Sequence, residues 1–225
     1  SNRRAVLGIG AGVSGFRELG VDAGRSAVAI REAVELIRRL LAGETVTVKG
    51  SEISFAGGHL DFAPPRPDLP IYVASQRLGG CRAAGRVADG AIMQGALADP
   101  LVRFLRETVH DAARQAGRDP ARVALVARLN VCVADDRTAA RNVMRPTVVR
   151  SLSAQRPDFF TFATAGLTLP AGLREKVLAL PYTHDPAPLR AVAPEVPDEF
   201  VDAVTLTGPP DVIALVGTAW HRVQR

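Results

Sequence analysis

The chain has 225 residues, of which 47% are hydrophobic and 23% charged, as in a soluble globular protein of one large domain or two small ones. No apolar run reaches the ~18 residues that a membrane span needs, and no basic segment followed by an apolar run opens the sequence, so we expect a cytoplasmic protein. The net charge is +5, but 26 of the 28 basic residues are arginines spread along the chain without a run, which argues against nucleic-acid binding and leaves a small anionic ligand open.

The first third of the sequence predicts a strand, a helix and a hairpin. Residues 4–10 form an apolar run typical of a buried strand, and it ends in the glycine-rich stretch "GIGAG", residues 8–12. From about 25 to 42, apolar residues recur at helical spacing, with Gly43 where a helix C-cap belongs. Apolar and polar residues alternate over 44–63, which predicts a β-hairpin.

The rest of the sequence alternates strands with helices. Strands are expected at 70–75, 91–96 and 123–134, the last long enough to contain a bend. Helices are expected over "GCRAAGRVADG", over 100–116, from Asp135 or Asp136 to about 149, and from about 207 onward. Residues 155–200 are rich in proline and predict a long loop with short helices. The alternation predicts an α/β fold with a parallel sheet and right-handed crossovers.

The cysteines and histidines predict no metal site. Cys81 and Cys132 form no CxxC pair, which favours reduced thiols in a cytoplasmic protein. The four histidines are scattered, so no set of zinc ligands with the usual spacing exists.

The "GIGAG" stretch admits three interpretations. Gly10, Gly12 and Gly15 match the G-x-G-x-x-G pattern of dinucleotide-binding folds. In that fold, a second strand ends in an acidic residue about 20 residues further on. Here the corresponding residues, 30–35, are predicted as helix. The glycines could instead only permit a tight turn at the end of a strand. The third interpretation depends on the wider sequence.

Four segments in order carry a family resemblance: "LGIGAGVSGFRELG", "REAVELIRRLLAGETVTVKG", "LDFAPPRPDLPIYVAS" and "AGRVADGAIMQG". Together they resemble the bacterial-luciferase-like flavin and deazaflavin oxidoreductases, and are most similar to the methylenetetrahydromethanopterin reductase branch, which uses coenzyme F420. The resemblance implies a TIM (β/α)8 barrel, here incomplete, with about strands 4 to 7 present. It implies a single partial barrel domain over 1–225, with the hairpin at 44–63 as an excursion and an irregular insertion at about 155–200.

The ends of the strands are the expected cofactor site, because TIM barrels place their sites at the carboxyl ends of strands. The resemblance places the cofactor's phosphate near the loop after the second of the four strands, where a helix begins. Relatives often have Gly-Pro where Arg77-Leu78 stand, and Arg77 could add a charged contact to the phosphate. The expected cofactor-binding residues are Gly10, Ala11, Gly12, Ser75, Gln76, Arg77, Gly79, Gly80, Gln94 and Gly95.

The function that the resemblance implies is an F420-dependent oxidoreductase moving a hydride between the deazaflavin and a small organic substrate. Two alternatives stay open: an FMN-dependent luciferase-like monooxygenase, and a non-catalytic flavin-binding protein. No catalytic residue is nominated, because the cofactor itself carries the hydride. A homodimer is also open, and the Phe159–Phe162 cluster fits either a substrate lid or a buried core.

Overall fold

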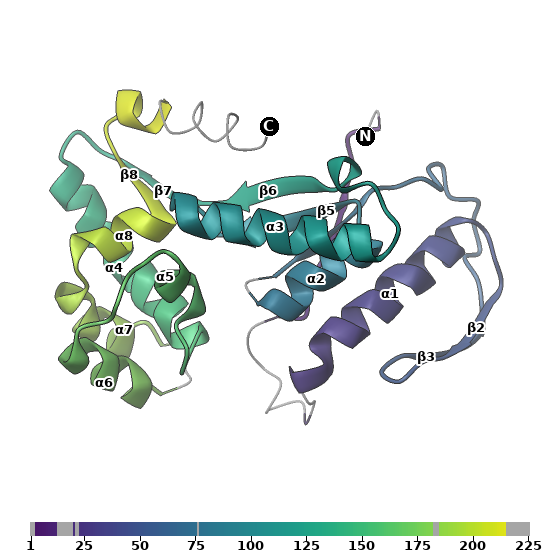
Figure 1. Cartoon of the computed structure of the whole chain (residues 1–225), viewed down its shortest axis with the longest axis horizontal. Coiled ribbons are helices and arrows are strands. Elements are labelled where there is room, and N and C mark those ends of the chain that lie inside the picture. The colour runs from purple at the N-terminus through teal and green to yellow at the C-terminus, as the bar shows by residue number, and fades with distance from the viewer. Residues whose placement is uncertain (1–2, 13–19, 21–22, 76, 182–184, 215–225) are drawn as a thin grey trace. The chain divides into compact units, whose positions relative to one another are not determined.

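A computed structural model of the chain describes residues 3–12, 20, 23–75, 77–181 and 185–214 (Figure 1). It separates into two compact units where the sequence predicts a single domain. The first unit comprises Ser1–Met93 and Leu105–Val126, and the second comprises Gln94–Phe104 and Ala127–Arg225. Each unit is described in turn.

A four-stranded sheet organises the first unit, with the order β1 (Leu7–Ile9), β4 (Ile71–Ala74), β5 (Gly90–Gln94) and β6 (Ala124–Arg128). β4 pairs in parallel with both β1 and β5, which confirms the predicted parallel α/β arrangement. Within the described residues these strands form an open sheet and no closed barrel. Ile9 lies opposite Val73, so the carboxyl ends of β1 and β4 meet at one edge.

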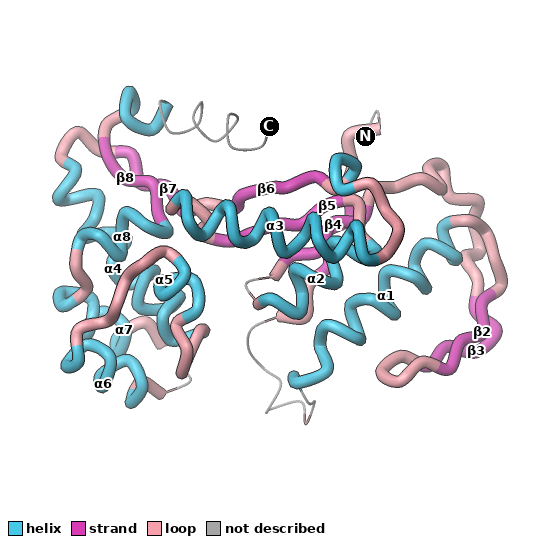
Figure 2. The backbone as a smooth tube through the Cα atoms, in the orientation of Figure 1, coloured by secondary structure: helices cyan, strands magenta, loops and turns pink. Residues whose placement is uncertain are grey.

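Helices α1 (Ser26–Leu41) and α2 (Leu78–Val87) run side by side in the same direction (Figure 2). At their amino ends, a Cβ added at Gly79 would come 3.3 Å from Ala27 Cβ. At their carboxyl ends, Arg38 donates to the carbonyl of Val87 at 3.1 Å. Both helices therefore begin at the edge of the sheet where β1 and β4 end.

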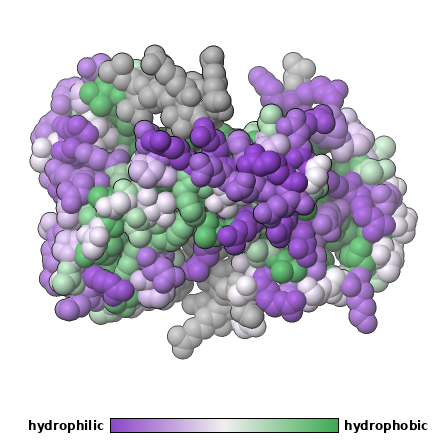
Figure 3. Space-filling view, in the orientation of Figure 1, coloured by the Kyte–Doolittle hydropathy of each residue, from purple (hydrophilic) through white to green (hydrophobic). Residues whose placement is uncertain are grey.

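Helix α3 (Asp99–Gln115) has one apolar side and one charged side, as its apolar periodicity predicts. Leu105 and Val109 are buried, whereas the ion pairs Asp99–Arg103 and Asp111–Arg114 lie on the exposed side. This side forms a hydrophilic band in Figure 3.

A hairpin follows α1, as predicted, and comprises antiparallel strands β2 (Val46–Lys49) and β3 (Ser54–Gly58). Its turn is held by one carboxylate from α1. Glu32 accepts the backbone N–H groups of Ser51, Glu52 and Ile53 at 2.9, 2.9 and 2.8 Å. These bonds favour the charged form and lower the pKa of Glu32 to about 2, so the carboxylate keeps the turn against α1 at any ordinary pH.

The segment "AGRVADG" anchors the carboxyl end of α2. A Cβ at Gly85 would lie 2.2 Å from the Val109 carbonyl oxygen, so glycine permits the close packing of α2 on α3. The Asp89 carboxylate accepts from the Arg38 guanidinium and from the Ile71 N–H, each at 2.9 Å. Arg118 donates to the carbonyls at the same end of α2, and burial lowers its pKa. This end of α2 is built for stability.

The second unit contains a strand that the sequence analysis missed. The predicted strand 123–134 bends as expected, since β6 ends at Arg128 and β7 (Asn130–Val133) begins two residues later. β7 pairs in parallel with β8 (Thr205–Gly208), where the prediction had the final helix beginning at 207. Helix is present from 210 to 214, so the predicted helix starts after this strand.

Residues 155–200 form a packed helical cluster and not an irregular insertion. Helix α4 (Arg137–Ala154) is followed by α5 (Phe160–Thr164), α6 (Ala171–Ala179), α7 (Ala187–Val192) and α8 (Asp198–Val204); short 3-10 turns lie at Ala23–Arg25, Pro120–Arg122 and Ala193–Glu195. Phe162 and Phe200 stack at 5.5 Å in the core, and Phe159 is also buried. Phe159 and Phe162 therefore belong to a core and not to a lid.

An ion-pair network joins α4 to α8. Arg141 binds both carboxylate oxygens of Asp202, at 3.0 and 2.5 Å, and one of Asp198 at 2.9 Å. Arg145 reaches the other oxygen of Asp198 and the carbonyl of Val196. The hydrogen bond to Asp202 raises the pKa of Arg141, as bidentate pairing stabilises the charged guanidinium.

Candidate functional site

The loop between β4 and α2 is shaped by one serine. Ser75 follows the last residue of β4, and its hydroxyl accepts the N–H of Arg77 and donates to the carbonyl of the same residue, both at 3.0 Å. A Cβ at Gly80 would lie 2.2 Å from this hydroxyl oxygen, so the start of α2 packs directly on Ser75. The Ser75 hydroxyl is thus engaged within the loop, and a single acceptor lone pair remains for a ligand.

The amino end of α2 presents hydrogen-bond donors beside a cation. Arg77 is the N-cap in extended conformation, and its carbonyl accepts the N–H of Cys81 at 3.1 Å. The preceding three amides, those of Leu78, Gly79 and Gly80, have no carbonyl partner within α2. Gly79 is exposed, and the exposed Arg77 guanidinium meets no partner within the described part of the chain. Amides at a helix start and an arginine together favour an anion such as phosphate.

The "GIGAG" stretch lies next to this loop. The register of β1 and β4 brings Gly10 beside Ala74, and a Cβ at Gly10 would come 3.0 Å from the Ala74 carbonyl oxygen. Gly12 has a φ of +76°, in the left-handed region that favours glycine. The fold therefore explains both glycines. Gly10 allows two strand ends to approach closely, and Gly12 allows the chain to turn. Gly15, the third glycine of the dinucleotide pattern, lies outside the described residues.

The remaining predicted site residues have different outcomes. Gln76 lies outside the described residues. Gln94 and Gly95 belong to the second unit, where Gly95 has a φ of +65° and donates to the Arg128 carbonyl at 3.0 Å. Its α-carbon packs on α8, since an added Cβ would lie 3.2 Å from Val204 Cβ. The structure brings together residues 10–12 with 75 and 77–80, all in the first unit.

Cys81, in the first turn and a half of α2, is not a reactive group. Its side chain is buried, and this burial raises the pKa of its thiol to about 11 although Arg82 acts in the opposite direction. The protonated thiol packs as a small apolar group, as the sequence analysis expects for a cysteine outside a metal or redox motif.

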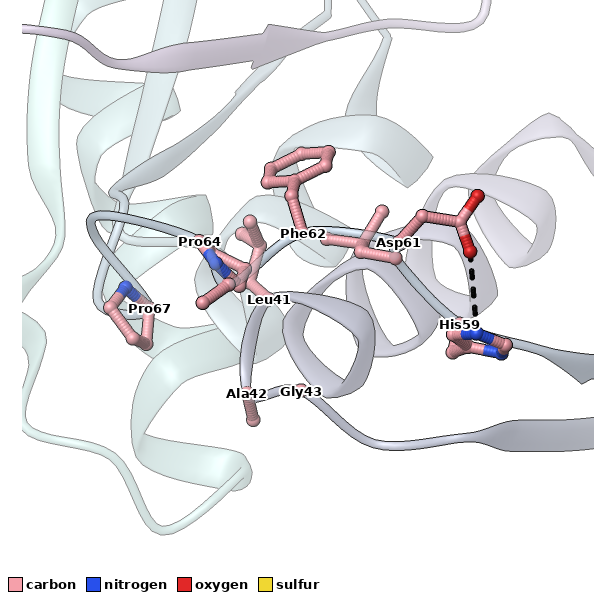
Figure 4. A pocket seen from close by; sticks show the side chains of 10 residues that line it. Leu41, Ala42, Gly43, His59, Asp61, Phe62, Pro64 and Pro67 are labelled. Carbon is pink, nitrogen blue, oxygen red and sulfur yellow. Dashed lines mark ion pairs between the residues drawn. The ribbon is translucent and has the colours of Figure 1, made fainter.

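A hollow of the first unit lies at the other end of α1 (Figure 4). It has a volume of about 640 Å³ and is lined by Leu41, Ala42, Gly43, His59, Leu60, Asp61, Phe62, Ala63, Pro64 and Pro67. His59 Nε2 and Asp61 Oδ1 lie 3.3 Å apart, and both side chains are largely exposed. The connector that lines it leads into the start of β4, so the hollow is at the amino ends of the strands, where barrels of this class do not carry their sites.

Neither a membrane-spanning helix nor a metal centre is found among the residues that the structure describes. In these ranges, none of the helices combines the length and apolar composition needed to span a membrane. The same residues contain no group of three or more His, Cys, Asp or Glu side chains that could hold a metal ion.

Sequence reasoning missed three groups of the first unit. Glu32 and Asp89 each bridge segments far apart in the chain, and no local pattern marks such a bridge. Arg31 also escaped notice, because its neighbours Arg82 and Arg86 lie 51 and 55 positions later and only the packing of α1 on α2 brings them together. The four-residue spacing of Arg82 and Arg86 on one helix is the only signal that the sequence contains.

Comparison with known protein sequences identifies relatives along almost the whole chain. The family model described as "Luciferase-like monooxygenase" matches residues 1–219. A 5,10-methylenetetrahydromethanopterin reductase of Archaeoglobus fulgidus is 30% identical over 214 residues, covering 94% of this chain and 62% of the relative. An F420-dependent glucose-6-phosphate dehydrogenase of Beutenbergia cavernae is 28% identical over 206 residues, covering 89% of this chain and 58% of the relative. The chain thus spans about three fifths of the length of these curated relatives.

Solved structures agree on the fold. A coenzyme F420-dependent tetrahydromethanopterin reductase from Methanopyrus kandleri superposes with a TM-score of 0.78 at 19% identity, over 98% of this chain and 66% of that one. An F420-dependent secondary alcohol dehydrogenase superposes with a TM-score of 0.69 at 18% identity, over 98% and 61%. The sequence match over 1–219, with this α/β fold, shows that the chain belongs to the luciferase-like monooxygenase family, and its relatives include methylenetetrahydromethanopterin reductases.

Proposed function

We propose that the chain is the cofactor-binding part of an F420-dependent oxidoreductase that transfers a hydride between the deazaflavin coenzyme and a small organic substrate. Proteins named as F420-dependent occur both among its sequence relatives and among the structures that share its fold. The observation in this chain that carries the proposal is the amino end of α2, where the exposed Arg77 stands beside the first-turn amides.

The residues present fit the phosphate of such a coenzyme. Arg77 would supply a charge-assisted hydrogen bond, and the amides of Leu78, Gly79 and Gly80 would donate at the positive end of the helix dipole. Gly79 is exposed, so no side chain of its own covers these amides. Ser75 keeps the loop in place through its two hydrogen bonds to Arg77.

The turn after β1 would flank the bound coenzyme. Gly10 and Gly12 are exposed and lie at the same edge of the sheet as Ser75. Without side chains they let a bound group approach the backbone closely. The coenzyme supplies the hydride chemistry when bound, and this chain supplies its position and the charge around its anionic part.

A parallel titration with coenzyme F420 and FMN tests the proposal, followed by cofactor absorbance and fluorescence. We expect micromolar binding of F420, weakened on the order of tenfold by Arg77→Gln, since one charge-assisted bond is lost. Arg122→Gln is the matched control, because Arg122 is exposed in the same unit and its side chain has no partner in the described residues. Preference for FMN would favour the monooxygenase alternative. Binding of neither cofactor would contradict the proposal.

A turnover assay separates the enzyme from a non-catalytic flavin-binding protein. Reduced F420 and a panel of small carbonyl and imine acceptors would be added to the chain and to a longer form of the protein. Oxidation of the coenzyme that does not consume oxygen supports the oxidoreductase. If both forms bind the coenzyme but turn over no acceptor, the protein binds the coenzyme without catalysis, and the proposed oxidoreductase activity is refuted.

A further inference from the structure

A groove between α1 and α2 gathers three arginines outside the site described above. It is lined by Ala27, Val28 and Arg31 of α1 and by Gly79, Arg82, Ala83 and Arg86 of α2. We call this set the arginine groove. Its volume is about 280 Å³, just below the roughly 300–1,000 Å³ of ligand pockets, so it suits part of a small molecule and not a polymer.

Among the described residues, no carboxylate pairs with the arginines of the arginine groove, which are Arg31, Arg82 and Arg86. Arg25, the N-cap of α1, and Arg38, within α1, pair instead with Glu52 and Asp89 at 2.8 and 2.9 Å. Those lining residues of the groove that the structure describes include no acidic side chain. Three like charges on one hollow repel one another, and a bound anion relieves that repulsion.

The helix directions add to this positive potential. α1 and α2 run in the same direction, and the groove begins at their first turns, which contain Ala27 and Gly79, and extends to Arg86 in the last turn of α2. Both helices therefore turn their positive dipole ends toward the same end of the groove. Guanidinium groups match phosphate and carboxylate oxygens in pairs, so these are the ligand groups that fit.

We propose that the arginine groove binds an oligoanionic chain, two or more phosphate or carboxylate groups in succession on a small molecule. This inference extends the proposed function and in part rests on it. Gly79 belongs both to the amino end of α2, where the coenzyme's phosphate would bind, and to the groove. Negative groups attached beyond that phosphate would therefore extend from Gly79 past Arg82 toward Arg86. The groove is then the site of the anionic tail of the coenzyme.

Tripolyphosphate titrated by calorimetry at low salt tests the groove without any coenzyme. We expect binding that weakens as salt is raised, and that falls about tenfold or more in the double variant Arg82→Gln/Arg86→Gln. The control Arg122→Gln removes an exposed arginine outside the groove and should bind as the native chain does. Circular dichroism shows whether each variant is folded. Equal binding by all three proteins, which means an adventitious ion only, would overturn the proposal.

A second comparison assigns the groove to the coenzyme. F420 with its anionic tail and the same deazaflavin truncated after the phosphate are titrated into the native chain and the double variant. We expect the double variant to lose affinity for the tailed form and to bind the truncated form normally. Equal loss for both forms, or for neither, would overturn the tail assignment. If the native chain binds tripolyphosphate through the groove but no deazaflavin, the proposed function fails and the oligoanion site stands.

Discussion

The two ends of helix α2 contrast sharply in how their polar groups are used. At the carboxyl end, the carbonyls of Gly85, Val87 and Ala88 accept from arginines, and Asp89 bonds both a guanidinium and a backbone amide. At the amino end, Arg77 is exposed and its guanidinium has no partner among the described residues. One end is saturated with internal bonds, and the other presents donors to the outside. Substitutions at the two ends should therefore change different measured quantities.

The largest effect is expected at Gly85. Gly85→Ala places a methyl group 2.2 Å from the Val109 carbonyl oxygen and 2.9 Å from Ala112 Cβ, so α2 and α3 must move apart. We expect a loss of roughly 3 kcal/mol in the free energy of unfolding, measured by urea denaturation. The matched control is Gly172→Ala in α6, where a Cβ meets nothing within 4 Å. Its unfolding free energy should change by less than about 0.5 kcal/mol. Equal effects at both positions would refute the packing argument.

Asp89 should show the next effect. Asp89→Asn keeps the shape of the side chain but removes the negative charge that receives Arg38 and the Ile71 amide. We expect a loss of about 1 kcal/mol in the free energy of unfolding, since the pair is partly exposed. Coenzyme affinity should be unchanged. A variant that loses coenzyme affinity while keeping its stability would show that the two ends of α2 are not separate in function.

The reverse pattern is expected at Arg77. Arg77→Gln removes an exposed side chain without a partner in the described residues, so the free energy of unfolding should stay within about 0.5 kcal/mol of the native value. F420 affinity should fall on the order of tenfold. A variant that is destabilised and binds F420 normally would contradict the assignment of the amino end.

The burial of Cys81 marks where the exposed amino end of α2 stops. Gly79 is exposed, whereas Cys81, two residues later, is buried with a pKa of about 11. Because this pKa is raised, the thiolate is only about one thousandth of the thiol at pH 8. Peptide mapping after iodoacetamide treatment at pH 8 should show alkylation of the half-buried Cys132 before Cys81. Faster labelling of Cys81 would mean that the start of α2 opens in solution.

The sequence predicted the framework well, because periodicity and turn residues are local signals. The strands that became β1, β4 and β5, the helices α1 and α3, and the hairpin all lie where the apolar pattern and the glycines indicated. β8 was missed because "TLTG" runs directly into Pro209-Pro210, and this stretch was interpreted as the start of a helix. Short helices were expected at 155–200, but their packing into a cluster was missed because no long apolar period marks its core.

The sequence predicted a candidate loop but not the charges around it. Glycines at strand ends and the residues after β4 indicated where a ligand would bind, and Gly10 and Gly80 turned out to be required by the packing of Ala74 and Ser75. The arginines were discounted because none is clustered along the chain. Folding brings Arg31 to Arg82 and Arg86, and such a cluster exists only in three dimensions.

Backbone amide chemical shifts, recorded by NMR while F420 is added to the chain, test the contrast between the two ends of α2 most directly. The account predicts the largest changes at Leu78, Gly79 and Gly80, with little change from Gly85 to Gly90. Shifts that concentrate at Gly85–Gly90, or that leave residues 78–80 unaffected while F420 binds, would contradict it.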